Sequence, residues 1–224
     1  TVTRRGTETI LAETVVLAAG ALGTPVILQR SGFEEAGSTL FVDLFVNTYG
    51  VTPDINMLNE PQMSLLADQF HDSRGFILSP YLNVPREVRF IEAGFRGASL
   101  PMARTVGLMT KMTDESVGRV FANGAVSKAP TERDEQRLRA GIDLARELLV
   151  EIGADPDTIV ESDYQGAHPG GTAPIGGIVD TDLQTDVEGL YVCDASVFPG
   201  SPGAPPILTI LALARRLGRH LGAD

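Results

Sequence analysis

The chain has 224 residues, of which 43% are hydrophobic and 21% are charged, with a formal net charge of −11 and a single cysteine. At about 150 residues per domain, this predicts one large domain or two small ones with a real core, and it excludes a disordered chain. The acidic balance argues against nucleic acid or an anionic membrane surface as the main partner. One cysteine excludes a disulfide scaffold and an all-cysteine zinc site.

The first ten residues predict two short alternating strands that turn at Arg5 and Gly6. This hairpin start, without an initiator methionine, predicts that the chain is cut from a larger fold. The longest strongly apolar stretch, 207–214, is too short for a membrane span of about 20 residues. With no signal segment in view, we expect a cytoplasmic protein without a membrane span.

A continuous apolar run at 14–19 predicts a strand covered on both faces. A turn at 20–23 should follow, and then a short helix at 26–30 that Thr24 caps and Gly32 ends.

Residues 33–127 have a different sequence pattern, in which short apolar stretches such as 40–46 and 75–78 are separated by Pro, Gly and Asn. They predict strands and loops of an antiparallel sheet. Residues 111–126 resemble a hairpin. Of the 18 lysines and arginines, only Lys111 and Lys128 are lysines, a bias that carries no functional conclusion at the level of sequence.

The clearest helix starts at Thr131, which forms an approximate capping box with Asp134, and ends at Gly153. Its apolar residues keep helical spacing, which predicts an amphipathic helix packed on a sheet with 132–135 as its solvated face.

The last third begins with a glycine-rich loop at 166–177 that holds His168. A buried-type strand at 190–193 follows and ends at Asp194. After a Pro- and Gly-rich loop, residues 207–221 predict a helix that is apolar on nearly every side at first, as buried helices are. The economical arrangement puts both ends of the chain in one α/β domain and the middle in a second domain.

Four segments, in order, resemble the glucose-methanol-choline (GMC) flavoprotein oxidoreductases. They are the strand and turn Val-Val-Leu-Ala-Ala-Gly-Ala-Leu-Gly-Thr-Pro at 15–25, the histidine loop His-Pro-Gly-Gly-Thr-Ala-Pro-Ile-Gly at 168–176, the pair 179–180 with the strand Leu-Tyr-Val-Cys-Asp-Ala-Ser-Val-Phe-Pro at 190–199, and the helix start Pro-Ile-Leu-Thr-Ile at 206–210.

The resemblance implies a fold class of α/β plus α+β: a partial FAD-binding Rossmann-like domain into which an antiparallel-sheet substrate domain is inserted. Residues 1–32 and 177–224 would be the C-terminal parts of the FAD-binding domain, and 33–176 the substrate-binding domain. The family's Gly-x-Gly-x-x-Gly phosphate cradle is absent from this sequence. We therefore expect the missing N-terminal portion of the same protein as a partner, and a fragment that alone is inactive.

The resemblance assigns His168 as the general base, since an imidazole with an ordinary pKa of about 6.5 suits proton removal near neutral pH. The alternative is a histidine in a structural turn. Asp194 and Ala195 would approach the phosphate–ribityl region of FAD, where the carboxylate accepts a hydroxyl hydrogen bond. The alternative for Asp194 is a helix or turn cap.

Ala19 and Gly20 would allow close approach of the backbone to FAD, or simply form a tight turn. Pro206 and Ile207 would begin a helix whose positive dipole end favours negative charge on the flavin, while the same helix also serves the core.

We expect no metal site. The acidic run 180–186 lacks the glycine of a calcium loop and is more typical of a turn. We expect Cys193 to be a packed core thiol. His71 and His220 have no partner at the spacing of metal ligands and are expected to be surface residues.

One departure from the family is Pro205, at the position where a second histidine or an asparagine usually stands. Proline offers no side-chain donor or acceptor, so the second polar contact to the substrate oxygen is missing. Either His168 works alone, another residue substitutes, or the chemistry differs from ordinary alcohol oxidation.

The sequence as a whole predicts the C-terminal fragment of an FAD-dependent oxidoreductase, similar to alcohol and choline dehydrogenases. It would oxidise the CH–OH group of a small alcohol by hydride transfer to flavin N5. A non-redox, lyase-like flavoprotein and a non-catalytic domain on the same fold are the alternatives.

Overall fold

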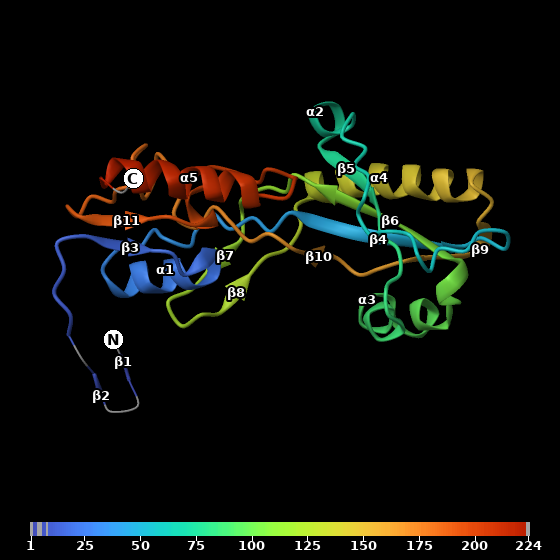
Figure 1. Cartoon of the computed structure of the whole chain (residues 1–224), viewed down its shortest axis with the longest axis horizontal. Coiled ribbons are helices and arrows are strands. Elements are labelled where there is room, and N and C mark those ends of the chain that lie inside the picture. The colour runs from blue at the N-terminus through green and yellow to red at the C-terminus, as the bar shows by residue number, and fades with distance from the viewer. Residues whose placement is uncertain (1, 4–5, 8, 223–224) are drawn as a thin grey trace.

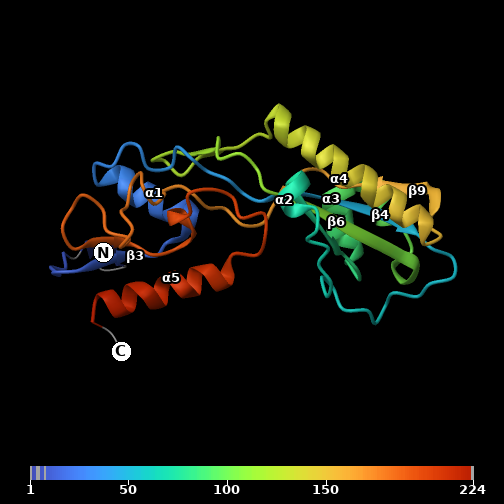
Figure 2. The ribbon, with the colours of Figure 1, turned by 90° about the horizontal axis from the view of Figure 1, so that it is seen from above.

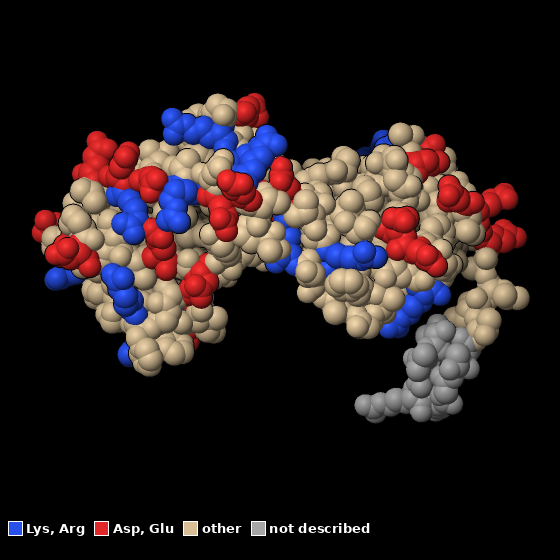
Figure 3. Space-filling model, turned by 180° about the vertical axis from the view of Figure 1, so that it is seen from behind, with Lys and Arg blue, Asp and Glu red and all other residues tan. Residues whose placement is uncertain are grey.

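The computed structural model describes residues 2–3, 6–7 and 9–222. It has two lobes joined by a narrow waist (Figure 1; Figure 3). One lobe holds both ends of the chain, and the other holds an antiparallel sheet formed by the middle of the chain. Acidic side chains are spread over the surfaces of both lobes in the view of Figure 3.

The first lobe is built on two short parallel strands, β3 (Val15–Leu17) and β11 (Leu190–Val192), which pair with Val16 opposite Tyr191. Helices α1 (Gly20–Arg30) and α5 (Ile207–His220) lie on opposite sides of this pair (Figure 1). The fully buried side chains of its core come from both ends of the chain and from the segments that lead to and from the other lobe: Leu28, Phe41, Ala173, Leu183, Val192 and Val197.

The predicted N-terminal hairpin is present as β1 (Val2–Thr3) and β2 (Gly6–Thr7), which pair antiparallel. Arg5, one of the two residues at the expected turn, lies outside the described residues.

Helix α1 begins earlier than the sequence predicted, because the expected turn at 20–23 is its first turn. Pro25 therefore lies inside the helix, where it cannot donate to the carbonyl of Ala21. The buried hydroxyl of Thr172 donates to that carbonyl instead, at 2.9 Å. The prediction of Thr24 as a helix cap was wrong, since its hydroxyl lies inside the helix and donates to Asp194. Gly32 ends the helix region with a positive φ, as expected.

The expected burial of the strand at 14–19 and of the last helix is not provided by this chain itself. Val15 and Val16 are exposed, and so are Leu208 and Leu211 on α5, with Leu208 77% exposed. Only Leu217 of α5 is buried, on the side that faces the lobe's core. Figure 2 shows α5 along the outside of this lobe. No other part of the described chain covers these surfaces.

The second lobe confirms the expected antiparallel strands. Its sheet has the order β10 (Gln165–Gly166), β4 (Leu44–Val51), β6 (Thr105–Met112) and β5 (Phe76–Pro80), and β9 (Asp155–Glu161) also pairs with β4. A hairpin of β7 (Arg119–Val120) and β8 (Val126–Ser127) occupies part of the expected 111–126 hairpin. Lys111 is not in it but in β6, between Phe45 and Ile77 of the neighbouring strands.

Helix α4 (Glu132–Glu151) covers one face of the sheet, and α3 (Arg86–Ser99) lies on the other (Figure 1). The capping box of Thr131 and Asp134 is present, and Gly153 follows the helix with a positive φ. Asp134 is nevertheless buried rather than solvated, because its carboxylate also accepts from the backbone of Glu115.

The remaining elements are short: α2 (His71–Arg74) and the 3-10 turns at Met102–Arg104 and Ala195–Val197. Across the described residues, every helix is too short or too polar to traverse a bilayer.

Candidate functional site

Three ionisable side chains meet where the two lobes join. Nδ1 of His168 lies 3.1 Å from Oδ2 of Asp43, and Nζ of Lys111 lies 3.4 Å from the same oxygen. Lys111 Nζ also contacts His168 Nδ1. The three residues come from distant segments: Asp43 precedes β4, Lys111 belongs to β6, and His168 follows β10. This cluster is the candidate site.

The histidine loop is held against the start of β4 by backbone hydrogen bonds. The amide of His168 donates to the carbonyl of Val42 at 3.0 Å, and Gly170 and Phe41 exchange two further hydrogen bonds. A side chain at Gly170 would overlap the ring of Phe41, since a Cβ there would lie 2.2 Å from Cζ. Glycine at this position therefore allows the approach that brings His168 to Asp43.

Asp43 is the structural centre of the cluster. Its side chain is fully buried, and its backbone has a φ of 51°, a left-handed conformation that aspartate tolerates better than most residues. Oδ1 accepts hydrogen bonds from Ser201 Oγ at 2.6 Å and from the amide of Gly203 at 3.2 Å. Asp43 thus connects His168 to the loop that precedes α5.

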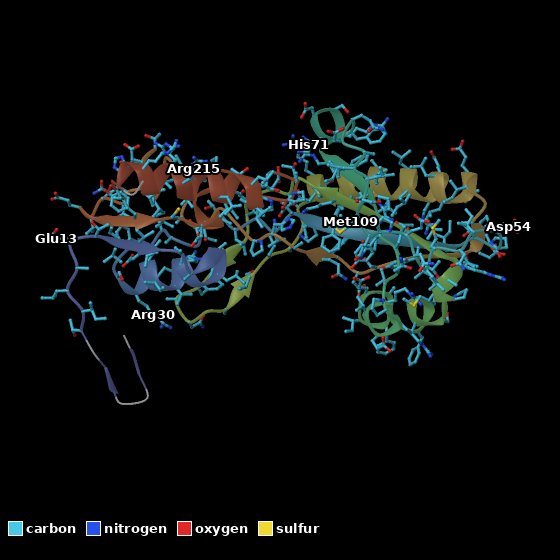
Figure 4. All side chains as sticks on the ribbon, in the orientation of Figure 1. Glu13, Arg30, Asp54, His71, Met109 and Arg215 are labelled. Atoms are coloured by element: carbon cyan, nitrogen blue, oxygen red, sulfur yellow. The ribbon has the colours of Figure 1, made fainter. Side chains whose placement is uncertain are left out.

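Lys111 points away from α4. Its neighbour Met112 packs against that helix, so alternation along β6 places Lys111 on the opposite face of the sheet, as it does Met109, whose side chain is marked in the middle of the sheet in Figure 4. The side chain of Lys111 is 3% exposed. Burial lowers the pKa of its ammonium, and the carboxylate of Asp43 opposes that effect.

A second buried ion pair lies beside the first. Lys128 Nζ is 2.8 Å from Oδ2 of Asp114, and Asp114 accepts from the amide of Asp43 at 2.8 Å. Both lysines of the chain are therefore buried at the junction between the lobes, each against a fully buried aspartate.

His168 is bound by the protein through one ring nitrogen. Asp43 and Lys111 both contact Nδ1, whereas no hydrogen-bond partner for Nε2 is found in the described part of the chain. The His168 side chain is 27% exposed. Nε2 is therefore the nitrogen that can bind a ligand.

The other predicted site residues fall into two groups. Ala19 and Gly20 meet Asp194 and Ala195 at the carboxyl ends of β3 and β11, where ligands of parallel sheets bind. Asp194 Oδ2 accepts from the amide of Gly20 at 2.9 Å and from Thr24 Oγ1 at 2.6 Å, while Oδ1 accepts from Ser196 at 2.7 Å. Asp194 thus ties the two strand ends together and caps the turn after β11.

Pro206 and Ile207 begin α5, and no side chain caps this helix. Ile207 is exposed, so the amides of the first turn can bind a ligand from outside the described chain. The loop before this helix reaches the His168 cluster through Ser201 and Gly203. Pro202 of the same loop accepts a hydrogen bond from His71, which lies next to the junction in Figure 4.

Sequence reasoning missed Asp43 and Lys111. Both interrupt apolar strand-like stretches, and the scarcity of lysine was the available signal for Lys111. It also missed a buried group on the α3 side of the sheet, in which Glu92 accepts from Tyr49, from Tyr81 at 3.1 Å and from Asn47 at 3.3 Å. Burial, followed by the Glu92 carboxylate, raises the pKa of Tyr81 to about 12 and also raises the pKa of Tyr49.

No group of three His, Cys, Asp or Glu side chains suited to a metal ion occurs among the described residues. Within the acidic run, Asp180 Oδ1 accepts from the amides of Asp182 and Gln184, as expected for a turn.

Among curated proteins, an uncharacterized protein of Methanocaldococcus jannaschii is 32% identical over 214 residues, which cover 95% of this chain and 54% of that protein. A long-chain-alcohol oxidase of Arabidopsis thaliana is 23% identical over 266 residues, which cover 92% of this chain and 36% of the oxidase. The chain thus spans about half or less of the length of these relatives.

Among solved structures, pyridoxine 4-oxidase from Mesorbium loti matches with a TM-score of 0.71 at 19% identity, covering 98% of this chain and 53% of that one. A variant of Aspergillus oryzae formate oxidase, studied for FAD modification, has a TM-score of 0.71 at 17% identity and covers 97% and 56%. At these identities the likeness shows the fold.

The family model described as GMC oxidoreductase matches residues 79–214. This range includes Lys111, Asp194 and the histidine loop, and it is more than half of the 224 residues. The chain therefore belongs to the GMC oxidoreductase family.

Proposed function

We propose that this chain is the C-terminal part of an FAD-dependent oxidoreductase that oxidises a CH–OH group, with His168 as the base. The observation that carries the proposal is the arrangement of the imidazole: Nδ1 contacts Asp43 and Lys111, and Nε2 is left for a substrate hydroxyl. Relatives named as alcohol and pyridoxine oxidases support an alcohol as the substrate class.

The residues at the strand ends fit FAD. Gly20 has a φ of 75°, and a Cβ there would meet nothing within 4 Å, so a large ligand can approach its backbone. The uncapped amides that follow Pro206 at the start of α5 favour a negatively charged or carbonyl group. We propose that Ala19, Gly20, Asp194, Ala195, Pro206 and Ile207 line the cofactor site. FAD, when bound, supplies the hydride acceptor at flavin N5.

In the proposed reaction, the substrate hydroxyl donates a hydrogen bond to Nε2 of His168. The imidazole takes the hydroxyl proton as the hydride leaves the adjacent carbon, so that the C–O bond becomes a carbonyl. Because Pro205 offers no side-chain hydrogen bond, His168 is the polar group of this chain that orients the substrate oxygen.

The two lobes support a two-domain organisation, although Phe41 and Ala173, between the proposed domain boundaries, pack in the core of the first lobe. We propose that 1–32 and 177–224 belong to the FAD-binding domain, a partial Rossmann-like unit that contains the parallel pair β3 and β11. Residues 33–176, with the antiparallel sheet, would be the inserted substrate-binding domain.

The exposed apolar surface of α5 and β3 indicates that this lobe is incomplete. We propose that the N-terminal portion of the same protein covers it, which agrees with relatives about twice as long as the matched region. The chain alone would then be inactive.

The test is replacement of His168 by alanine in the full-length flavoprotein, with Arg139→Ala, at an exposed position of α4 in the other lobe, as the control. Anaerobic flavin reduction by a panel of alcohols should slow at least about 100-fold in His168→Ala, which is the usual effect of losing a general base. It should be unchanged in Arg139→Ala.

An unchanged rate in His168→Ala would refute the assignment of the base. Pro205 also favours a second candidate, a lyase-like flavoprotein that does no redox work. In that case the protein would retain flavin, but no alcohol of the panel would reduce it.

A further inference from the structure

The carboxylate of Asp43 is fully buried, and an unpaired charge in such a place is costly. Two basic groups reach its Oδ2: Lys111 Nζ at 3.4 Å and His168 Nδ1 at 3.1 Å. One positive charge is enough to balance one carboxylate. Which of the two groups holds the proton therefore determines the charge of His168.

Intrinsic basicity favours the lysine. An alkyl ammonium has an ordinary pKa of about 10.4, against about 6.5 for an imidazole, so the amine is the stronger base by a wide margin. Burial lowers the pKa of Lys111, but the Asp43 carboxylate opposes this effect. If both groups were charged, an ammonium and an imidazolium would be in direct contact at Nδ1.

The neighbouring charges do not supply a substitute. Asp114 and Lys128 form their own pair at 2.8 Å and reach Asp43 only through its backbone amide. His71 contacts the Pro202 carbonyl and the Asp72 carboxylate. In the part of the chain that the structure describes, Lys111 is thus the one ammonium that touches both Asp43 and His168.

We propose that Lys111 is a positioning residue for His168: its buried ammonium balances Asp43 and so keeps the imidazole uncharged, while the carboxylate that it holds accepts a hydrogen bond from Nδ1 and leaves Nε2 free for the substrate. This inference rests on the proposed function, in which His168 must be neutral to accept a proton. In the tautomer that leaves Nε2 unprotonated, Nδ1 donates to Asp43, so the Lys111 ammonium donates to the carboxylate and not to the ring nitrogen.

The direct test is the charge of His168 itself. In the full-length flavoprotein labelled with ¹⁵N-histidine, the imidazole signals of His168 are identified by their loss in His168→Gln. Their pH titration is then followed in the wild type and in Lys111→Met, which keeps the length of the buried side chain without the charge. The titration midpoint should be higher in Lys111→Met than in the wild type, because Asp43 then faces the ring without its counter-charge.

Two matched variants make the result specific. Lys128→Met removes the other buried ammonium, which does not touch His168, and should leave the midpoint unchanged. Asp43→Asn removes the carboxylate and should lower the midpoint, in the direction opposite to Lys111→Met. The acid limb of the pH profile of flavin reduction should move with the midpoint in each variant.

A wild-type imidazole that is already charged at pH 7, or a midpoint that does not move in Lys111→Met, would overturn the proposal. If Lys111→Met does not fold, the proposal is tested by the titration of the wild type and of Asp43→Asn. Failure of the proposed function would give a different result: His168→Ala would still reduce flavin at the wild-type rate, independently of the titration midpoints measured for His168. If His168→Ala is inactive and the midpoint in Lys111→Met is unmoved, only the role of Lys111 is refuted.

Discussion

Single buried charges in this protein are each matched by a specific group. Arg89 donates to three backbone carbonyls, Lys111 and Lys128 pair with aspartates, and Glu92 accepts from three neutral donors. Such matching is required because a buried charge without partners costs several kcal/mol. The tyrosines around Glu92 illustrate the consequence for pH.

We predict that the chain loses stability at alkaline pH through these tyrosines. Tyr81 has its pKa raised from 10.0 to about 12, and that of Tyr49 is raised in the same direction, so the folded state holds both phenol protons more tightly than the unfolded state. Their contribution is complete below about pH 10 and is lost as the pH rises towards 12.

Urea unfolding of the full chain between pH 9 and about 11.5 measures this, since that window spans the ordinary tyrosine pKa of about 10. Tyr49→Phe should be less stable at pH 9, because Glu92 loses a donor, but should show a smaller decline in the free energy of unfolding with pH. An equal decline in the wild type and the variant would contradict the prediction.

At the scale of elements, α1 is linked to the histidine loop by a hydrogen bond that compensates for the proline inside the helix. Its internal Pro25 leaves the Ala21 carbonyl without a helical donor, and Thr172 of the histidine loop supplies one. The loop that carries His168 is thereby attached to the helix that follows β3.

Thr172→Val is therefore expected to destabilise the chain by about 1–3 kcal/mol, the cost of leaving a buried carbonyl unpaired. Thr48→Val is the matched control, since Thr48 is equally buried but its hydroxyl has no hydrogen-bond partner. The control should be neutral or slightly stabilising. Thermal unfolding of both variants gives the comparison, and equal losses would show that the hydrogen bond to Ala21 is not responsible.

For the whole molecule, apolar side chains remain exposed on both lobes, with Ile91 and Phe95 on α3 and Leu208 and Leu211 on α5. The antiparallel sheet itself has α4 on one face and α3 on the other, whereas the outer face of the parallel pair is left exposed at Val15 and Val16. A hydrophobic surface of this kind on a parallel-strand lobe is expected where further elements of a domain are to pack.

Leu211→Glu, on the exposed side of α5, should therefore weaken assembly with the N-terminal portion. In the full-length protein we expect loss of bound flavin, measured by its absorbance after gel filtration. Phe95→Glu is the control, since Phe95 is similarly exposed on α3 of the other lobe. Retention of flavin in Leu211→Glu would contradict the proposed cover, and equal loss in both variants would mean that the effect is not local to α5.

Local patterns predicted the elements well where the signal was strong. The capping box at Thr131, the glycine that ends α4 and the strand before Asp194 depend on neighbours in sequence. The start of α1 was missed, because the donor that makes an internal Pro25 tolerable comes from Thr172, far along the chain. The middle strands lacked motifs, and β6 was not predicted as a strand.

The sequence by itself determined the family resemblance, the two chain ends that form one lobe, and His168 as the candidate base. Those features depend on contiguous motifs, which can be recognised from the sequence without knowledge of the fold. Only the tertiary structure decided which groups surround His168, because Asp43 and Lys111 come from separate strands and are brought together by sheet pairing and by the loop before α5. Burial makes the contact of Asp43 with these basic groups energetically important, since a buried carboxylate requires a counter-charge that an exposed one does not.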